Sequence, residues 1–244
     1  SIYIFMKEIA QIRKLSLWIF FIPLIAINLC LFISQNPEFL ENTFFTVDQI
    51  GRSGFSIPYL DGSLSISRAS RTFPQYLIFK PAMIITAITL YYYWSNNNSL
   101  VNKFKSTNID YKFKTFGILS AIFLAIHSIF LGIKFDYDLY KFFRRVVMLF
   151  FIIFEIVAQA YLVKTLYSFK EKLLEYLNLS ILRLKILLVI VLIVVAVVSI
   201  PIISLPGDDF MGFNLKFFKH GLEWDYFLGV ISFYLLTFLM WKKS

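Results

Sequence analysis

An acidic residue lies near the middle of a long apolar stretch of the chain. Glu155 interrupts the run 146–166, and Gln159 follows one helical turn later on the same helix face. A carboxyl group in hydrocarbon costs on the order of a few kcal/mol, so it must face other helices and find a partner. The best candidate partner is His127, in the apolar run 115–133. The pair could relay protons, bind a polar headgroup or join two helices by a hydrogen bond.

A second group of polar side chains lies in SISRASRTFP, residues 65–74, just before another apolar run. Ser65 and Ser67 have no histidine nearby in the sequence, so we expect them to hydrogen-bond the loop backbone rather than to act as nucleophiles. Arg68 and Arg71 are three residues apart and could clamp a phosphate or carboxylate. Alternatively, both arginines anchor the loop by extending into the headgroup region.

Two further groups of ionisable residues could interact with each other: Arg144 and Arg145 with Asp136 and Asp138, and Asp208 and Asp209 with Glu223. For the first group a solvated interface is the simpler interpretation. For the second, adjacent acids beside Pro and Gly are typical of a turn, although they could hold a cation. The largest loop, residues 35–75, has no His–Cys metal pattern, nucleophile elbow or glycine-rich phosphate loop. We therefore predict no metal and no cofactor, and we favour a protein without a catalytic centre.

These side chains must be positioned by helices that cross a membrane. The 244-residue chain is 59% hydrophobic and only 16% charged, and its mean hydropathy is +0.72. Six segments reach the length needed to cross about 30 Å of hydrocarbon: 16–34, 76–94, 115–133, 146–166, 183–205 and 224–241. Because backbone groups in lipid must satisfy each other, the sequence predicts one all-α domain, residues 1–244, built as a six-helix membrane bundle. We expect the first span to be an uncleaved anchor.

The distribution of cationic residues predicts the orientation of this bundle. Short loops rich in Lys and Arg stay in the cytoplasm. Fourteen of these residues fall on the side that holds both termini, the 95–114 loop and the 164–185 loop, against ten on the other side. Both termini are therefore expected in the cytoplasm, and the large loop 35–75 on the outer side.

The net charge of +9 favours contact with anionic partners. A cationic cytoplasmic face attracts anionic lipid headgroups, whereas nucleic-acid binding is not indicated because no recognition motif accompanies the charges. Lys185 belongs to the predicted 164–185 loop, so no lysine lies deep in a late span. This argues against a retinal-type photoreceptor.

Two short motifs resemble the damage-regulated autophagy modulator family. The first, before the second span, is SIS followed by a proline and a phenylalanine: Ser65, Ile66, Ser67, Pro74 and Phe79. The second is the acidic–aromatic pair Glu223 and Trp224 in GLEWDYF, at the start of the last span. That family is similar to proteins that remodel the lipid of GPI anchors. The resemblance implies a protein that binds or regulates lipids, with residues 65–74 as a lid over the mouth of the bundle.

Our interpretation is an integral membrane protein that binds or regulates membrane lipids, and we expect these lipids to be anionic. Its candidate residues at the outer mouth are Ser65, Ser67, Arg68, Arg71, Glu223 and Trp224, and its candidate residues inside the membrane are His127, Glu155 and Gln159. Two alternatives stay open. One is a small-solute or proton-coupled transporter that uses Glu155. The other is an accessory subunit of a larger membrane complex, for which the aliphatic fifth span offers a partner surface.

Overall fold

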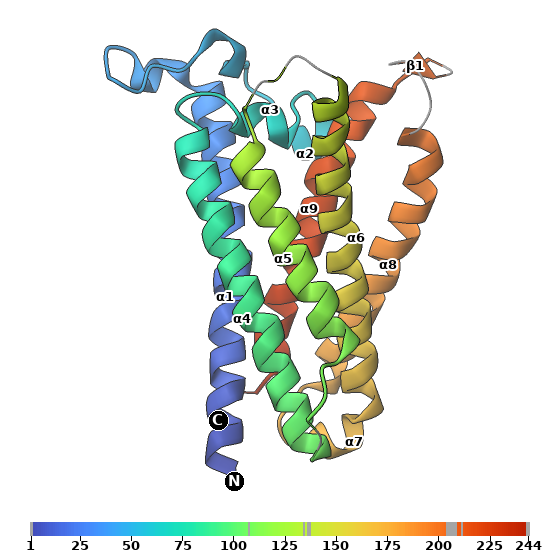
Figure 1. The fold of residues 1–244 in the computed structure, drawn as a ribbon. Coiled ribbons are helices and arrows are strands. Elements are labelled where there is room, and N and C mark those ends of the chain that lie inside the picture. Colours follow the sequence, from blue (N-terminus) through green and yellow to red (C-terminus); the bar gives the residue numbers. More distant parts are fainter. Residues whose placement is uncertain are drawn as a thin grey trace.

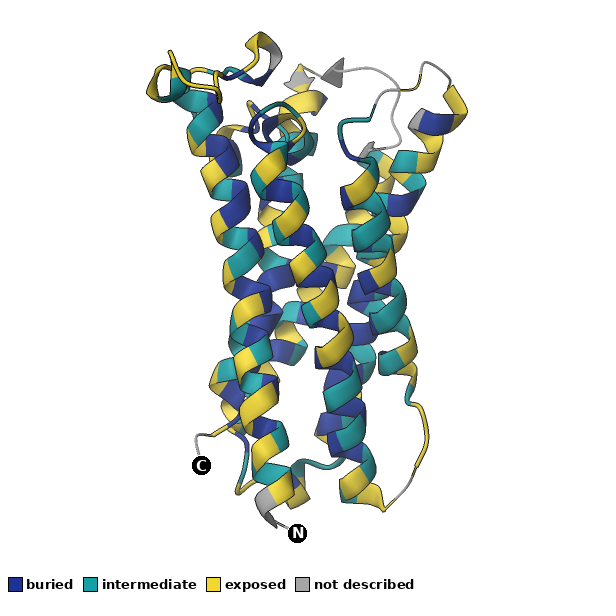
Figure 2. Ribbon diagram, turned by 60° about the vertical axis from the view of Figure 1, so that its left-hand side comes forward, coloured by how far each residue is buried: buried dark blue, intermediate teal, exposed yellow. Residues whose placement is uncertain are grey.

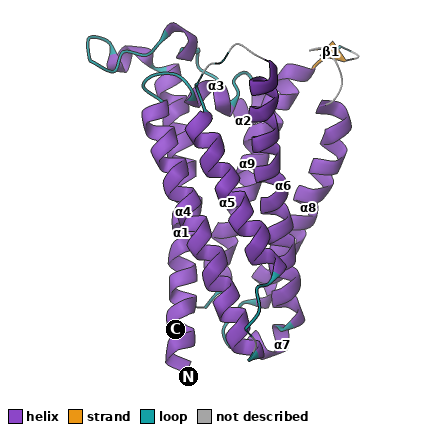
Figure 3. Ribbon diagram, in the orientation of Figure 1, coloured by secondary structure: helices purple, strands orange, loops and turns teal. Residues whose placement is uncertain are grey.

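The computed structural model describes residues 2–106, 108–133, 135, 138–203, 209–210 and 212–242. Most of these residues are helical (Figure 3). The elements follow in the order α1 (Ile2–Gln35), η1 (Pro37–Leu40), η2 (Gln49–Gly51), α2 (Pro58–Asp61), α3 (Ile66–Ser70), α4 (Tyr76–Lys105), α5 (Lys112–Phe130), α6 (Asp138–Ser168), α7 (Lys170–Leu173), α8 (Leu179–Ile203), β1 (Asp209–Phe210), β2 (Phe213–Asn214) and α9 (Leu215–Met240). The two strands form a small antiparallel hairpin.

The six long helices confirm the six predicted spans. Each of α1, α4, α5, α6, α8 and α9 is long and apolar enough to cross a membrane. The large loop between the first two spans is also confirmed, because residues 36–75 contain only short helices. Ser204 and Leu205, the last two residues of the predicted fifth span, lie outside the described residues.

The predicted loop 95–114 is wrong over most of its length, because α4 continues to Lys105. Asparagine side chains near the end of α4 bond backbone groups of the helix and of the following connection. The Asn97 Nδ2 donates to the Tyr93 carbonyl at 2.8 Å, and the Asn98 Oδ1 accepts from the Tyr111 N–H at 2.9 Å. The connection to α5 is therefore short, and these asparagines brace it.

Both chain termini lie at one end of the bundle, which we call the terminal end (Figure 1). Residues 36–75 and the β-hairpin lie at the opposite end, which we call the capped end. In sequence-adjacent pairs, α4 packs against α5, α5 against α6 and α8 against α9, while α1 closes the bundle against α4 and α9. This arrangement agrees with an even number of crossings, and the cytoplasmic location of the terminal end stays a prediction.

The interior of the bundle is rich in aromatic side chains, and its outer surface is apolar as well. Buried residues face inward along every long helix, and exposed residues face outward (Figure 2). Trp94, Trp224 and Tyr93 are fully buried, whereas Leu187 and Val197 on α8 are more than half exposed. Exposed aliphatic residues of this kind suit a surface in contact with lipid tails.

Candidate functional site

The segment 65–74 is fastened to the beginning of α9. Ser65 caps α3, because its Oγ accepts a hydrogen bond from the Arg68 N–H at 3.1 Å. The Trp224 Nε1 donates to the Leu64 carbonyl at 2.7 Å. The Glu223 carboxylate lies against the backbone N–H groups of Ile66 and Ser67, where the first turn of a helix favours negative charge. The two motifs named in the sequence therefore meet in space, and they hold α3 over the capped end.

A close approach of backbones fixes the short helix α2 against the beginning of α9. Gly62 ends α2 with a φ of 60°, and a Cβ built there would lie 1.7 Å from the Phe217 carbonyl oxygen in α9. The ring of Tyr59 packs edge-on against Trp224, with 4.9 Å between the centroids. The His220 Nδ1 lies 3.0 Å from the Gly62 carbonyl. Residues 57–70 thus form a packed cover over the mouth of the bundle.

Replacing Gly62 with alanine is expected to loosen this cover. The added Cβ meets main-chain atoms, which cannot rotate away, and the left-handed backbone adds strain. We expect a fall of several °C in the midpoint of thermal unfolding in detergent. Gly54→Ala is the matched control, because a Cβ at Gly54 meets nothing within 4 Å. Equal midpoints for the two variants would contradict the described contact.

Three arginines gather at the capped end, and we call Arg68, Arg71 and Arg144 the arginine cluster. Arg68 and Arg71 are exposed on α3 and at its end, and Arg144 comes from the first turns of α6. Partial burial of its guanidinium group, and then the positive charges of Arg144 and Arg68, lower the pKa of Arg71. The Arg144 Nε is buried without a hydrogen-bond partner. In the part of the chain that the structure describes, no carboxylate pairs with any of the three.

The buried carboxylate of Glu155 is enclosed by three hydrogen-bond donors. We call Glu155 and these donors the carboxylate cluster. The carboxylate oxygens accept from Ser120 Oγ at 2.6 Å, from Gln159 Nε2 at 3.1 Å and from the Tyr234 hydroxyl. Gln159 shares the helix face of Glu155, as the spacing predicts, and the hydrogen bond between them is a finding of the structure. The predicted partner His127 is wrong, because Ser120 of α5 occupies that place. His127 lies two helical turns nearer the capped end, about 10 Å along the axis, and near Arg144.

Lys185 is fully buried in α8, so its assignment to a cytoplasmic loop is wrong. Its Nζ donates to the Thr237 Oγ1 at 2.7 Å and lies 4.0 Å from the centroid of the Phe233 ring. The Thr237 hydroxyl also lies 3.1 Å from the Tyr93 hydroxyl. Leu182 and Val189, which share the helix face of Lys185, are buried too.

The lysine and the carboxylate cluster share a layer of aromatic rings. Tyr93, next to Thr237, and Tyr234, next to Glu155, pack edge-on with 5.0 Å between their centroids. Helices α4, α5, α6, α8 and α9 all contribute a polar group to this layer. The arrangement joins five helices through hydrogen bonds that lipid cannot replace.

The structure does not assemble the two remaining predicted groups of ionisable residues into a site among the described residues. Asp136 and Asp208 lie outside the described residues. Arg145 is exposed, one position beyond the arginine cluster. Among the described residues, no group of three His, Cys, Asp or Glu side chains could hold a metal ion.

The six apolar helices and their buried polar layer define an integral, multi-pass membrane protein. No protein-family model, no curated protein and no solved structure matches the chain.

Proposed function

We propose that this membrane protein binds the phosphate group of membrane lipids at its capped end, through the arginine cluster. The observation that carries the proposal is the meeting of three guanidinium groups with no carboxylate paired to them in the described residues. Like charges at close range repel, so a bound anion lowers the energy of the cluster. Planar guanidinium groups match a phosphate with paired hydrogen bonds, and this favours phosphate as that anion.

The place of the cluster supports a lipid as the source of the phosphate. Arg68 and Arg71 are exposed beside the capped ends of the apolar helices, where lipid headgroups lie. Below them, the outward-facing side chains of α4 and α5 are largely apolar, and Ile85, Ile88, Ile122 and Ile129 are about half exposed. The resemblance to the damage-regulated autophagy modulator family points the same way, and that relationship is itself part of the proposal.

The other predicted residues of the mouth serve this proposal by holding α3 in place. Ser65 caps the helix, Trp224 hydrogen-bonds the chain just before it, and Glu223 lies against its first N–H groups. These contacts keep Arg68 and Arg71 next to Arg144 without themselves touching a ligand. Ser67 contributes its carbonyl, which accepts from the Arg71 N–H at 3.1 Å.

Removing the arginines tests the proposal directly. In the double variant Arg68→Ala with Arg71→Ala, and separately in Arg144→Gln, we expect the amount of co-purified anionic lipid to fall. Each cation near a headgroup contributes about 1 kcal/mol, which corresponds to about fivefold in affinity. Mass spectrometry of the purified protein, before and after incubation with phosphatidylglycerol, measures the bound lipid.

The neighbouring exposed residue provides the control for that experiment. Arg145→Gln removes the same charge from the same helix one position away, and should leave the bound lipid nearly unchanged. Unchanged lipid in the double variant and in Arg144→Gln, or an equal loss in Arg145→Gln, contradicts the proposed site. Thermal unfolding of each variant in detergent separates a lost site from a lost fold.

A further inference from the structure

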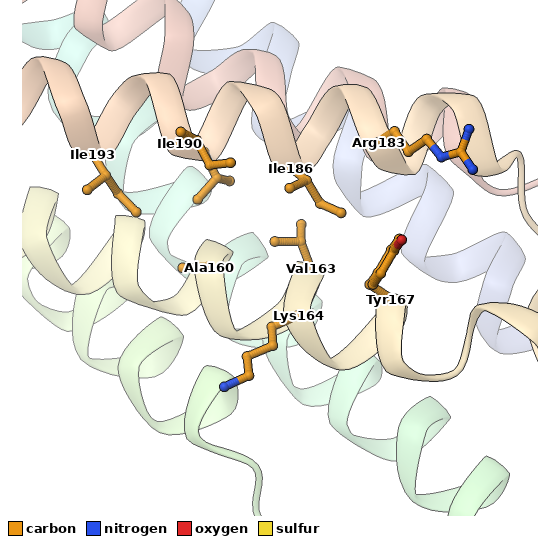
Figure 4. A pocket seen from close by; sticks show the side chains of 9 residues that line it. Ala160, Val163, Lys164, Tyr167, Arg183, Ile186, Ile190 and Ile193 are labelled. Carbon is orange, nitrogen blue, oxygen red and sulfur yellow. The ribbon is translucent and has the colours of Figure 1, made fainter.

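A groove of about 570 Å³ runs between α6 and α8, on the half of the bundle nearer the terminal end (Figure 4). Its walls are apolar side chains from both helices: Ala160, Val163, Ile186, Ile190 and Ile193. From Arg183 to Ile193 the groove follows ten residues of α8, or about 15 Å. That length is about half the thickness of the hydrocarbon core, so the groove spans one leaflet.

Of the two cationic residues of the groove, Arg183 lies at the end nearer the terminal end of the bundle, and Lys164 lies near the middle. Arg183 stands at its end on α8, while Lys164 and Tyr167 contribute from α6 (Figure 4). Figure 4 shows the Lys164 amino group turned away from α8, so that its methylene stem lines the groove. Both cations are exposed, and in the described residues neither pairs with a carboxylate. Their long, flexible side chains can reach a charged group at the membrane surface while their stems stay in the apolar region.

We propose that an anionic phospholipid occupies this groove. One acyl chain lies along Ile186, Ile190 and Ile193, and the lipid phosphate contacts Arg183 and, after rotation of its side chain, Lys164. An apolar channel one leaflet long, with the Arg183 guanidinium group at its surface end, matches the shape and charge of such a lipid. The site shares no residue with the arginine cluster and lies at the other end of the bundle, so it is independent of the function proposed above.

A lipid titration with matched variants tests this site. The purified full chain in detergent is titrated with palmitoyl-oleoyl phosphatidylglycerol, or with the phosphatidylcholine of the same chains, and native mass spectrometry counts the bound lipids. The wild type should bind phosphatidylglycerol more tightly than phosphatidylcholine. Arg183→Gln should weaken phosphatidylglycerol binding about fivefold and phosphatidylcholine binding less, because the choline cation offsets the phosphate charge.

Substitutions in the apolar wall test the position of the acyl chain. Ile190→Trp fills the groove and should remove one bound lipid of either kind. Leu187→Trp adds the same ring to an exposed position of α8 that does not line the groove, and should remove none. Both tryptophan variants are also measured in the Arg68→Ala, Arg71→Ala background, in which the arginine cluster is disabled. Lipid binding at the groove can then be judged even if the proposed function of the arginine cluster is wrong.

Several outcomes would overturn the inference. Equal affinity for the two lipids, or binding unaffected by Arg183→Gln, would show that the cations do not select a headgroup. Full lipid occupancy in Ile190→Trp would place the acyl chain elsewhere. Co-purification of another membrane protein that Ile190→Trp abolishes, with lipid binding unchanged, would assign the groove to a partner helix instead.

Discussion

Replacing Gly117 with alanine is expected to lower the free energy of unfolding by about 1–3 kcal/mol, the usual cost of forcing extra volume into a packed core. A Cβ at Gly117 would lie 2.2–2.4 Å from three ring atoms of Trp94. The indole is fully buried and cannot turn aside, because it packs against Tyr93, Phe113 and Tyr234. Thermal unfolding in detergent, followed by size-exclusion chromatography of the surviving monomer, measures the loss.

A control and a rescue make this prediction specific. Gly229→Ala is the matched control, because its Cβ meets only the flexible end of Leu192. The rescue combines Gly117→Ala with Trp94→Leu, which removes the colliding ring. The double variant should lose less stability than the sum of the two single variants. If the losses in the free energy of unfolding of the two single variants simply add, Gly117 is not required to make room for the Trp94 ring.

Replacing Glu155 with leucine is expected to cost about 2 kcal/mol, the sum of three interhelical or intrahelical hydrogen bonds of the strength found in membrane proteins. The substitution leaves the Tyr234 hydroxyl buried without its acceptor, and it withdraws the Glu155 oxygens from Ser120 and Gln159. The measurement is the unfolding midpoint in detergent, beside that of Val157→Leu on the same helix.

The more conservative change to glutamine separates two roles of Glu155. An amide retains an oxygen that can accept from Tyr234, so Glu155→Gln should keep most of the stability that Glu155→Leu loses. If Glu155 only joins helices, the wild type reconstituted in liposomes shows no proton-driven solute flux. Flux in the wild type that disappears in a well-folded Glu155→Gln variant would support the transporter alternative.

The hydrophobic segments were predictable because each span is determined mainly by its own composition. Apolar length alone located all six helices, and the cost of a carboxyl group in lipid was enough to identify Glu155 as a residue with partners. The spacing of four residues then placed Gln159 beside it. These inferences need no knowledge of how one helix is rotated or shifted against another.

The partners from other helices were not predictable, because they depend on relative depth and rotation. His127 was expected about one helical turn from the depth of Glu155, but Ser120, seven residues earlier on α5, makes the contact instead. Lys185 was assigned to a loop because it follows other cations in the sequence, although the buried face of α8 includes it. Arg144 joined Arg68 and Arg71 only when the fold brought the start of α6 beside α3.

Helix α6 carries one charged residue of each proposed lipid site, so the distance between these two residues can be compared with the thickness of the bilayer. Arg144 and Lys164 lie twenty residues apart on α6, or about 30 Å along its axis, which equals the thickness of a typical hydrocarbon core. A thinner membrane forces this helix to lean if both ends are to keep their headgroup contacts, and a thicker one pulls one contact away. Together, the two proposed sites fit a membrane of ordinary thickness, and a bilayer of another thickness would weaken one of the two headgroup contacts.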